Sequence, residues 1–157
     1  MPSPTLLIIG AGHVGRAVAE LSGWLGLDTV VWDDRAELGA ALAAAVETLD
    51  RVHSGPIDQV LVDEPLTTAD AVVAVTRNAE LDLDLLPHLL TSDAGYIGLM
   101  GSARRWATTR SRLRDAGVPE AQIDRIRTPI GREIHAETPE EIAVSILSEV
   151  LDTLEGA

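Results

Sequence analysis

The chain has 157 residues, of which 46% are hydrophobic, and this length and composition predict a single domain spanning residues 1–157 with a substantial core. It contains no cysteine and no lysine, which excludes disulfides, thiolate metal sites, a bound persulfide, a P-loop lysine and a Schiff-base lysine. The net charge of −13 argues against general nucleic-acid binding.

The first predicted unit is a strand, a glycine-rich turn and a helix. Residues 5–9 predict the strand, residues 13–25 predict the helix, and Gly10-Ala11-Gly12-His13-Val14-Gly15 between them has the spacing G-x-G-x-x-G. In a nucleotide-binding unit of this kind, the first glycine permits the turn, the second lets a pyrophosphate approach the backbone, and the third lets the helix pack closely. The N–H groups at the helix start would bind the phosphates.

The second predicted strand, residues 29–33, ends in two acids. Asp33 lies 21 residues after Gly12, close to the spacing of about 20 at which such units place a ribose-binding acid. We expect Asp33 or Asp34 to bind ribose-like hydroxyls and the other to cap the next helix, residues 36–45, with Arg35 following them. The alternative is a glycine turn that only packs a strand on a helix, with both acids solvated.

The rest of the chain continues the alternation of strands and helices. The pattern predicts strands at 59–62, 70–76 and 95–102, and helices at 78–90, 103–116, 119–123 and, after a Thr138 cap, up to about residue 154. This order is typical of an α/β fold of Rossmann-like, doubly wound type, with a mainly parallel sheet and helices on both faces. Ligands of such folds bind beyond the carboxyl ends of the strands. We therefore expect the loops 10–15, 76–79 and 101–105 to converge on one crevice.

Charge is distributed unevenly along the chain. Residues 101–132 hold eight arginines and three acids, a net of +5, in a chain that is otherwise strongly acidic. The segment favours an anionic ligand or an acidic partner, and the alternative is a solvated helix face. Arg104 and Arg105 follow a glycine turn at a strand end, so we expect at least one of them to contact a ligand. Arg110, Arg112 and Arg114 are expected on the helix surface.

Several motifs together resemble a known family. They are the Gly10–Gly15 turn, Val31-Trp-Asp-Asp-Arg35, Tyr96-Ile-Gly-Leu-Met-Gly-Ser102, Ala116-Gly-Val-Pro119, and Thr128-Pro-Ile-Gly131 with the run from Ala136 to Ile146. The combination, over nearly the whole chain, is similar to the C-terminal Rossmann domain of the XdhC/CoxI family of xanthine dehydrogenase accessory proteins. The resemblance implies a protein that binds molybdenum cofactor, assists its sulfuration and helps insert it into a molybdenum hydroxylase.

The resemblance also implies a set of cofactor-binding residues. It carries over Gly10, Gly12, His13, Gly15, Gly98, Gly101, Ser102 and Arg104 by match to the family motifs. With the residues around the predicted strand ends, the full set that we expect at the cofactor is Gly10, Gly12, His13, Val14, Gly15, Asp33, Asp34, Arg35, Thr76, Gly98, Gly101, Ser102, Arg104 and Arg105. Glycine loops and arginines suit phosphate groups.

The chain departs from the family pattern in three places. It lacks the N-terminal family domain, so we expect either a separate partner that supplies that domain or a narrower function. Thr76-Arg77-Asn78-Ala79 stands where the family usually has Thr-His, which argues against a histidine-dependent role for that loop. Gly131-Arg132-Glu133-Ile134-His135 replaces a leucine–aspartate–isoleucine–glycine run, which puts the ligand contacts of that loop in doubt.

Three functions remain open from the sequence. The first is a non-catalytic accessory protein for molybdenum cofactor, with a cysteine desulfurase as partner because the chain has no thiol. The second is an NAD(P)-binding oxidoreductase domain, and the third is a nucleotide-sensing regulatory module. No nucleophile with a base beside it is evident, so we assign no catalytic residue, and the scattered histidines predict no metal site.

The assembly and location are expectations as well. The resemblance implies a homodimer, and the apolar C-terminal helix is a candidate for its contact. The sequence has no apolar run of 18 residues and no basic segment at Met1–Pro4, so we predict a cytoplasmic protein that neither spans nor contacts a membrane.

Overall fold

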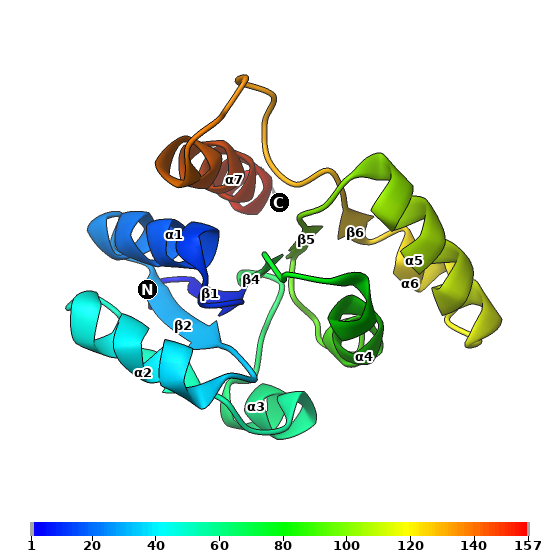
Figure 1. The fold of residues 1–157 in the computed structure, drawn as a ribbon, viewed down its shortest axis with the longest axis horizontal. Coiled ribbons are helices and arrows are strands. Elements are labelled where there is room, and N and C mark those ends of the chain that lie inside the picture. The colour runs from blue at the N-terminus through cyan, green and yellow to red at the C-terminus, as the bar shows by residue number, and fades with distance from the viewer. Residues whose placement is uncertain (1, 157) are drawn as a thin grey trace.

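Residues 2–156, described by a computed structural model, form a six-stranded sheet in the order β3-β2-β1-β4-β5-β6 (Figure 1). Every neighbouring pair of strands is parallel. The strands are β1 (Thr5–Ile9), β2 (Asp28–Trp32), β3 (Arg51–His53), β4 (Ala71–Ala74), β5 (Tyr96–Leu99) and β6 (Ile126–Arg127). The helices are α1 (His13–Trp24), α2 (Ala36–Ala45), α3 (Ile57–Asp63), α4 (Ala79–Leu89), α5 (Ala103–Asp115), α6 (Glu120–Ile123) and α7 (Pro139–Glu155).

The core has one layer on each face of the sheet. Leu6 and Ile8 of β1 pack with residues of α1, α2 and α7, whereas Leu7 and Ile9 pack with residues of α3, α4, α5 and α6. Successive side chains of a strand point to opposite faces, so a strand covered on both sides is apolar throughout. The predicted doubly wound, Rossmann-like fold is therefore confirmed.

The strand order reverses between β1 and β4. The connection after β1 runs through α1 on one face, and the connection after β4 runs through α4 on the other, as Figure 1 shows. The two connections leave the sheet in opposite directions, which opens a crevice beyond the carboxyl ends of these strands. The glycine loop and the segment after β4 meet at this point.

Residues 46–68 have no clear hydrophobic periodicity, and the sequence prediction contains its main errors there. Residues 59–62 belong to the helix α3 and are not a strand. The β-branched run there misled the prediction, because Ile57 and Val60 are the residues that α3 buries and their spacing is helical. The two edge strands β3 and β6 were missed, since each has only two or three residues.

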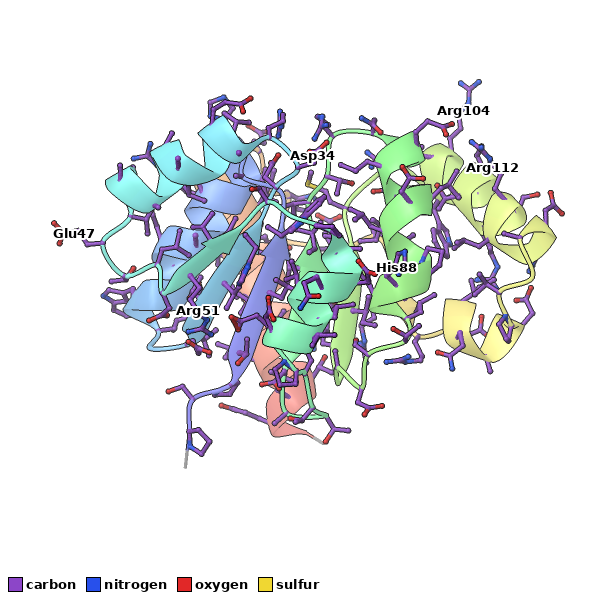
Figure 2. All side chains as sticks on the ribbon, turned by 90° about the horizontal axis from the view of Figure 1, so that it is seen from below. Asp34, Glu47, Arg51, His88, Arg104 and Arg112 are labelled. Atoms are coloured by element: carbon purple, nitrogen blue, oxygen red, sulfur yellow. The ribbon has the colours of Figure 1, made fainter. Side chains whose placement is uncertain are left out.

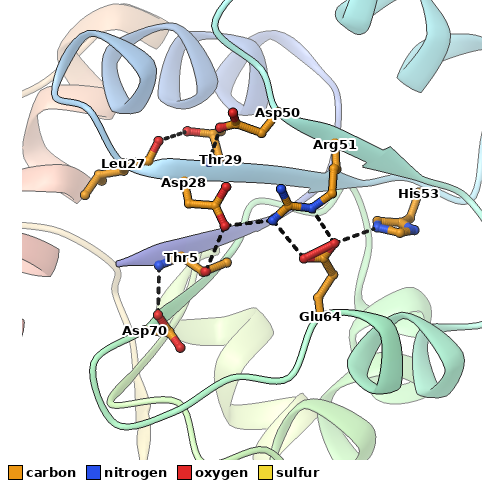
Figure 3. Close-up of polar contacts among 9 residues, drawn as sticks. All are labelled: Thr5, Leu27, Asp28, Thr29, Asp50, Arg51, His53, Glu64 and Asp70. Atoms are coloured by element: carbon orange, nitrogen blue, oxygen red, sulfur yellow. Dashed lines mark hydrogen bonds and ion pairs between the residues drawn. The ribbon is translucent and has the colours of Figure 1, made fainter. Parts of the chain in front are cut away.

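A polar cluster fixes the short edge strand β3 to its neighbours (Figure 3). Arg51 of β3 donates to the carboxylate of Glu64, just after α3, and to Asp28 at the start of β2. Hydrogen bonds from Arg51 lower the pKa of Asp28 and outweigh its partial burial. His53 lies 3.3 Å from the same Glu64 carboxylate. Polar contacts hold this edge, because so short a strand offers little apolar surface.

The C-terminal helix α7 is part of the core. Thr138 caps it, as predicted, in a reciprocal capping box with Glu141. Its apolar residues Ala143, Ile146, Leu147 and Val150 are buried in the layer that also contains α1. The expected dimer contact through this apolar face is therefore wrong, because the face is already covered within the chain. The homodimer itself stays a prediction.

Candidate functional site

The glycine loop begins the site, and its three glycines occupy different environments. The backbone of Gly10 has a φ of 119°, a conformation that residues other than glycine rarely adopt. A Cβ on Gly15 would lie 1.9 Å from the carbonyl oxygen of Gly10, so Gly15 permits the close packing of α1 on the loop. A Cβ on Gly12, in contrast, would meet no atom of residues 2–156 within 4 Å. Gly12 therefore faces open space.

The start of α1 is not capped by the protein. Its N-cap residue is Gly12, and within the described part of the chain no side chain bonds to its first turn, which also carries no acid. Asn78, Ser102 and Thr138 cap α4, α5 and α7, whereas α2, α3 and α6 resemble α1 in having no side-chain cap among the described residues. The start of α1 differs from these three in following the glycine loop. The first N–H groups of a helix require an acceptor and attract anions. The start of α1 is thus available to an external anion.

Asp33 follows β2 at the wall of a crevice, where its carboxylate is bonded to groups of the protein itself. Its side chain is 1% exposed, and it accepts hydrogen bonds from the N–H of Ala11 at 2.8 Å and from the backbone and guanidinium of Arg35. Burial opposes ionisation of Asp33, but these bonds outweigh it and hold its pKa well below the usual range. Asp33 therefore positions the glycine loop and Arg35.

The neighbouring acid, Asp34, is exposed and paired across the crevice. Its two carboxylate oxygens each accept a hydrogen bond at 3.0 Å from Arg77, which follows β4. The expectation that one of the two acids caps α2 is wrong, because α2 has Arg35 at its N-cap and no side-chain cap among the residues described. Gly10, Gly12, Asp34, Thr76 and Arg77 line a crevice of about 140 Å³.

Thr76, which lines this crevice, belongs to a hydrogen-bond network with Asp82 and Arg105. Thr76 donates to the carboxylate of Asp82, an α4 residue that is 1% exposed. The guanidinium of Arg105 donates to the same carboxylate, and also to the Thr76 hydroxyl at 3.0 Å. Two of the predicted cofactor-binding residues, Thr76 and Arg105, therefore contact each other and join α5 to α4 and β4.

The third predicted loop does not line the crevice. Ser102 caps α5 by accepting from the N–H of Arg105, and Arg104 projects away from the body of the molecule (Figure 2). Gly98 is buried in β5, where a Cβ would lie 2.7 Å from Tyr96 and from Ile130. Gly98 is thus a packing residue. Of the three predicted loops, 10–15 and 76–79 come together at the crevice, where the segment 32–35 joins them. Gly101 instead lines a cleft of about 440 Å³ with the segment 129–136.

The arginines of residues 101–132 are largely bound to groups of the protein itself. Arg110 pairs with Glu120 and Asp124, Arg114 with Glu120, and Arg112 with Glu80. Further along the segment, Arg125 donates to the carbonyls of Leu90, Ser92 and Ala94, and Arg132 pairs with Asp152. These contacts correct the expectation that the segment as a whole offers a basic surface to an anion.

His13 and Val14 start α1 but lie differently. His13 is exposed and lines, with Arg16 and Arg35, a second cleft of about 370 Å³ between α1 and α2. Val14 packs partly buried against the core. His13 and Arg35 are thus placed at the open side of the glycine loop, whereas the side chain of Val14 packs against the layer that contains α1 and α7.

Arg77 and Asp82 are site residues that the sequence analysis did not single out. Asp82 had a usable signal, because it is an acid on the face of α4 that also buries Leu85, Leu86 and Leu89. Among residues 2–156, no group of three or more His, Asp or Glu side chains is placed to hold a metal ion. No helix within the same range is long and apolar enough to cross a membrane.

Comparison with known proteins assigns the family. The profile of the XdhC Rossmann domain matches residues 6–150. The chain belongs to this family. The chain is 36% identical over 156 residues to YqeB, an uncharacterized protein of Escherichia coli (strain K12). It is 30% identical over 152 residues to a protein of Bacillus subtilis (strain 168) that is named as a probable xanthine dehydrogenase component.

Solved structures confirm the fold of this XdhC domain. A crystal structure described as that of a xanthine dehydrogenase from Bacillus halodurans matches 99% of the chain with a TM-score of 0.81 and 27% identity. LigD from Sphingobium sp. strain SYK-6 matches 97% of the chain, and 87% of its own, with a TM-score of 0.60 and 19% identity, which shows the fold alone. The chain spans 28% of YqeB, 43% of the B. subtilis protein and 44% of the B. halodurans chain.

Proposed function

We propose that this XdhC domain binds molybdenum cofactor through its phosphate groups at the start of α1, as a non-catalytic accessory to a molybdenum hydroxylase. The observation that carries the proposal is the glycine loop, which leaves Gly12 facing open space and the first turn of α1 without a cap from the described residues. The kinship to proteins named as xanthine dehydrogenase components supports a hydroxylase of that class as the client.

The residues fit the phosphate end of the cofactor. A phosphate at the start of α1 would accept hydrogen bonds from backbone N–H groups and gain from the helix dipole. The chemistry of the hydroxylase would come from the molybdenum and pterin. The part of the chain that the structure describes has no side-chain cluster for the metal itself. The 157 residues contain no cysteine, so sulfur for the cofactor would come from outside this domain, and we propose a cysteine desulfurase as its source.

An NAD(P)-binding oxidoreductase or a nucleotide sensor uses the same glycine chemistry, but the second strand argues against it. An NAD site needs an acid at the end of β2 to bind the ribose. Asp33, at that position, is buried and already bonded to Ala11 and Arg35, and Asp34 beside it is paired through both carboxylate oxygens with Arg77. Binding of NAD(P) without binding of the pterin would reverse this preference, and hydride transfer would add the oxidoreductase function.

The proposal is tested by calorimetric titration of the protein with anaerobically released molybdenum cofactor, with NAD(H) and with NADP(H). Gly12→Asp should lose cofactor binding, because its carboxylate caps α1 and repels the phosphate. The same cap should stabilise the fold by only about a few tenths of a kcal/mol relative to glycine, so loss of binding with an unchanged or slightly raised melting temperature separates ligand exclusion from misfolding.

Gly12→Ala is the matched control, because a methyl group has room there and adds no charge. Its methyl group obstructs the approach of a phosphate to the backbone without repelling it, so Gly12→Ala should bind more weakly than wild type but more tightly than Gly12→Asp. The proposal fails if the wild-type protein binds no pterin cofactor, or if Gly12→Asp binds it as tightly as Gly12→Ala does.

A further inference from the structure

The ion pair between Asp34 and Arg77 lies across the entrance to the anion site. Asp34 follows β2 and Arg77 follows β4, and β1 with its glycine loop lies between these two strands. Both side chains are about 40% exposed, and both line the crevice to which Gly10 and Gly12 also contribute. The pair thus bridges the crevice at the point where the strand order reverses.

The geometry of the pair imitates a phosphate complex. Arg77 donates one hydrogen bond from each of its two terminal nitrogens to the two oxygens of Asp34, at 3.0 Å each. A phosphate accepts the same two parallel hydrogen bonds from an arginine. Asp34 therefore occupies the donors that an anionic ligand in this crevice would use.

The backbone on both sides of Arg77 is fixed, so only its side chain has to move. Thr76 belongs to the network with Asp82 and Arg105, and Asn78 caps α4 by accepting from the N–H of Leu81 at 2.8 Å. An ion pair as exposed as this one contributes little to stability, because water screens its charges. A phosphate at the glycine loop can therefore displace Asp34 at small cost.

We propose that Arg77 is a ligand-recognition residue for a phosphate or pyrophosphate group bound at the glycine loop, and that Asp34 is its internal competitor. The ligand replaces the carboxylate of Asp34 on the guanidinium of Arg77. This inference rests on the proposed function, because it requires an anion at the start of α1. It goes further by assigning roles in ligand binding to Arg77 and Asp34, which lie outside the glycine loop.

The test is the affinity of two variants for anaerobically released molybdenum cofactor and, separately, for inorganic pyrophosphate. Arg77→Gln should weaken binding about tenfold, since it removes a charge-assisted bond to phosphate. Asp34→Asn should tighten binding by up to about fivefold, because the ligand no longer has to break the ion pair. The double variant should bind as weakly as Arg77→Gln.

Two charge-matched controls separate local from general electrostatics. Arg104→Gln and Glu47→Gln change the net charge by the same amounts, and both side chains project away from the crevice (Figure 2). Neither should change affinity by more than about twofold, because exposed charges this far from the ligand are screened. Effects of opposite sign at Arg77 and Asp34 are the signature of competition, since a purely structural pair would weaken binding from either side.

Each outcome decides the proposal. It is overturned if Arg77→Gln and Asp34→Asn shift affinity in the same direction, if neither shifts it, or if the wild type binds neither probe. Cofactor binding that Gly12→Asp abolishes, with no effect of Arg77→Gln, would leave the proposed function standing and this inference wrong. If the protein binds pyrophosphate with effects of opposite sign in Arg77→Gln and Asp34→Asn, but binds no pterin cofactor, this inference stands and the proposed function is wrong.

Discussion

The glycine loop at the start of α1 and the arginine-rich segment at residues 101–132 offer two different ways to attract an anion. The loop presents backbone N–H groups at an open position, and the segment carries a formal net charge of +5. In the folded chain, most of these arginines are already bound. They form ion pairs with acids of α4, α6 and α7 or donate hydrogen bonds to carbonyls after α4. Formal charge along a sequence thus overstates the charge that a surface offers, whereas an uncapped helix start depends on local geometry alone.

The largest predicted effect concerns the role of Arg105. Arg105→Gln should lower the free energy of unfolding by about 4 kcal/mol, because it leaves the buried carboxylate of Asp82 without its charged partner. Urea unfolding measures this, with Arg104→Gln as the exposed neighbour, which should stay within about 0.5 kcal/mol of wild type. If Arg105→Gln kept full stability but abolished cofactor binding, residues 101–132 would contain the ligand site, contrary to its assignment to the glycine loop.

The second prediction separates the glycines of the loop. Gly15→Ala should cost about 3 kcal/mol, because its methyl group would overlap the carbonyl of Gly10 and force α1 away from the strand. Gly12→Ala should cost about 1 kcal/mol or less, because only helix capping changes. Thermal or urea unfolding of both variants tests this, and equal losses would show that Gly12 is not the open position of the loop.

The third prediction uses the pH dependence of Asp33. Its pKa is lower in the folded chain than in the unfolded one, since hydrogen bonds from Arg35 and Ala11 outweigh its burial. Its contribution to stability is therefore full above about pH 4, the unfolded value, and is lost as the pH falls below it. Asp33→Asn should be about 2 kcal/mol less stable than wild type at pH 7.

The gap between Asp33→Asn and wild type should narrow as urea unfolding is repeated from pH 5 down to pH 2. A gap that stays constant over this range would mean that Asp33 holds the glycine loop without its charge. Because Asp33 bonds Ala11 in the loop, the same series reports how firmly the loop is held at the site.

The sequence was sufficient for the fold and for the glycine loop, since both depend on local patterns. The apolar strands and the glycine spacing each involve residues close together in the sequence. The Thr138 cap was recognisable because its helix-start signals also follow one another in the sequence. The pairs Arg77–Asp34 and Arg105–Asp82 join residues 43 and 23 positions apart. Such long-range ion pairs depend on which loops and helices the topology places side by side, so the partner of each arginine was not predictable from spacing.

The same reason explains the misassigned role of Gly98. A glycine in a strand suggests either a ligand or a tight contact, and only the packed structure shows Tyr96 and Ile130 against it. The short strands β3 and β6 were missed because neighbours stabilise them: the Arg51 cluster holds β3, and pairing with β5 holds β6.

The most direct test compares the two regions with one ligand. Anaerobically released molybdenum cofactor is titrated into the wild type, Gly12→Asp and the triple variant Arg110→Gln/Arg112→Gln/Arg114→Gln. We predict that the triple variant binds within about threefold of wild type, because its exposed arginines already pair with acids, and that Gly12→Asp does not bind. Binding that survives in Gly12→Asp but is lost in the triple variant would contradict the assignment of the site to the glycine loop.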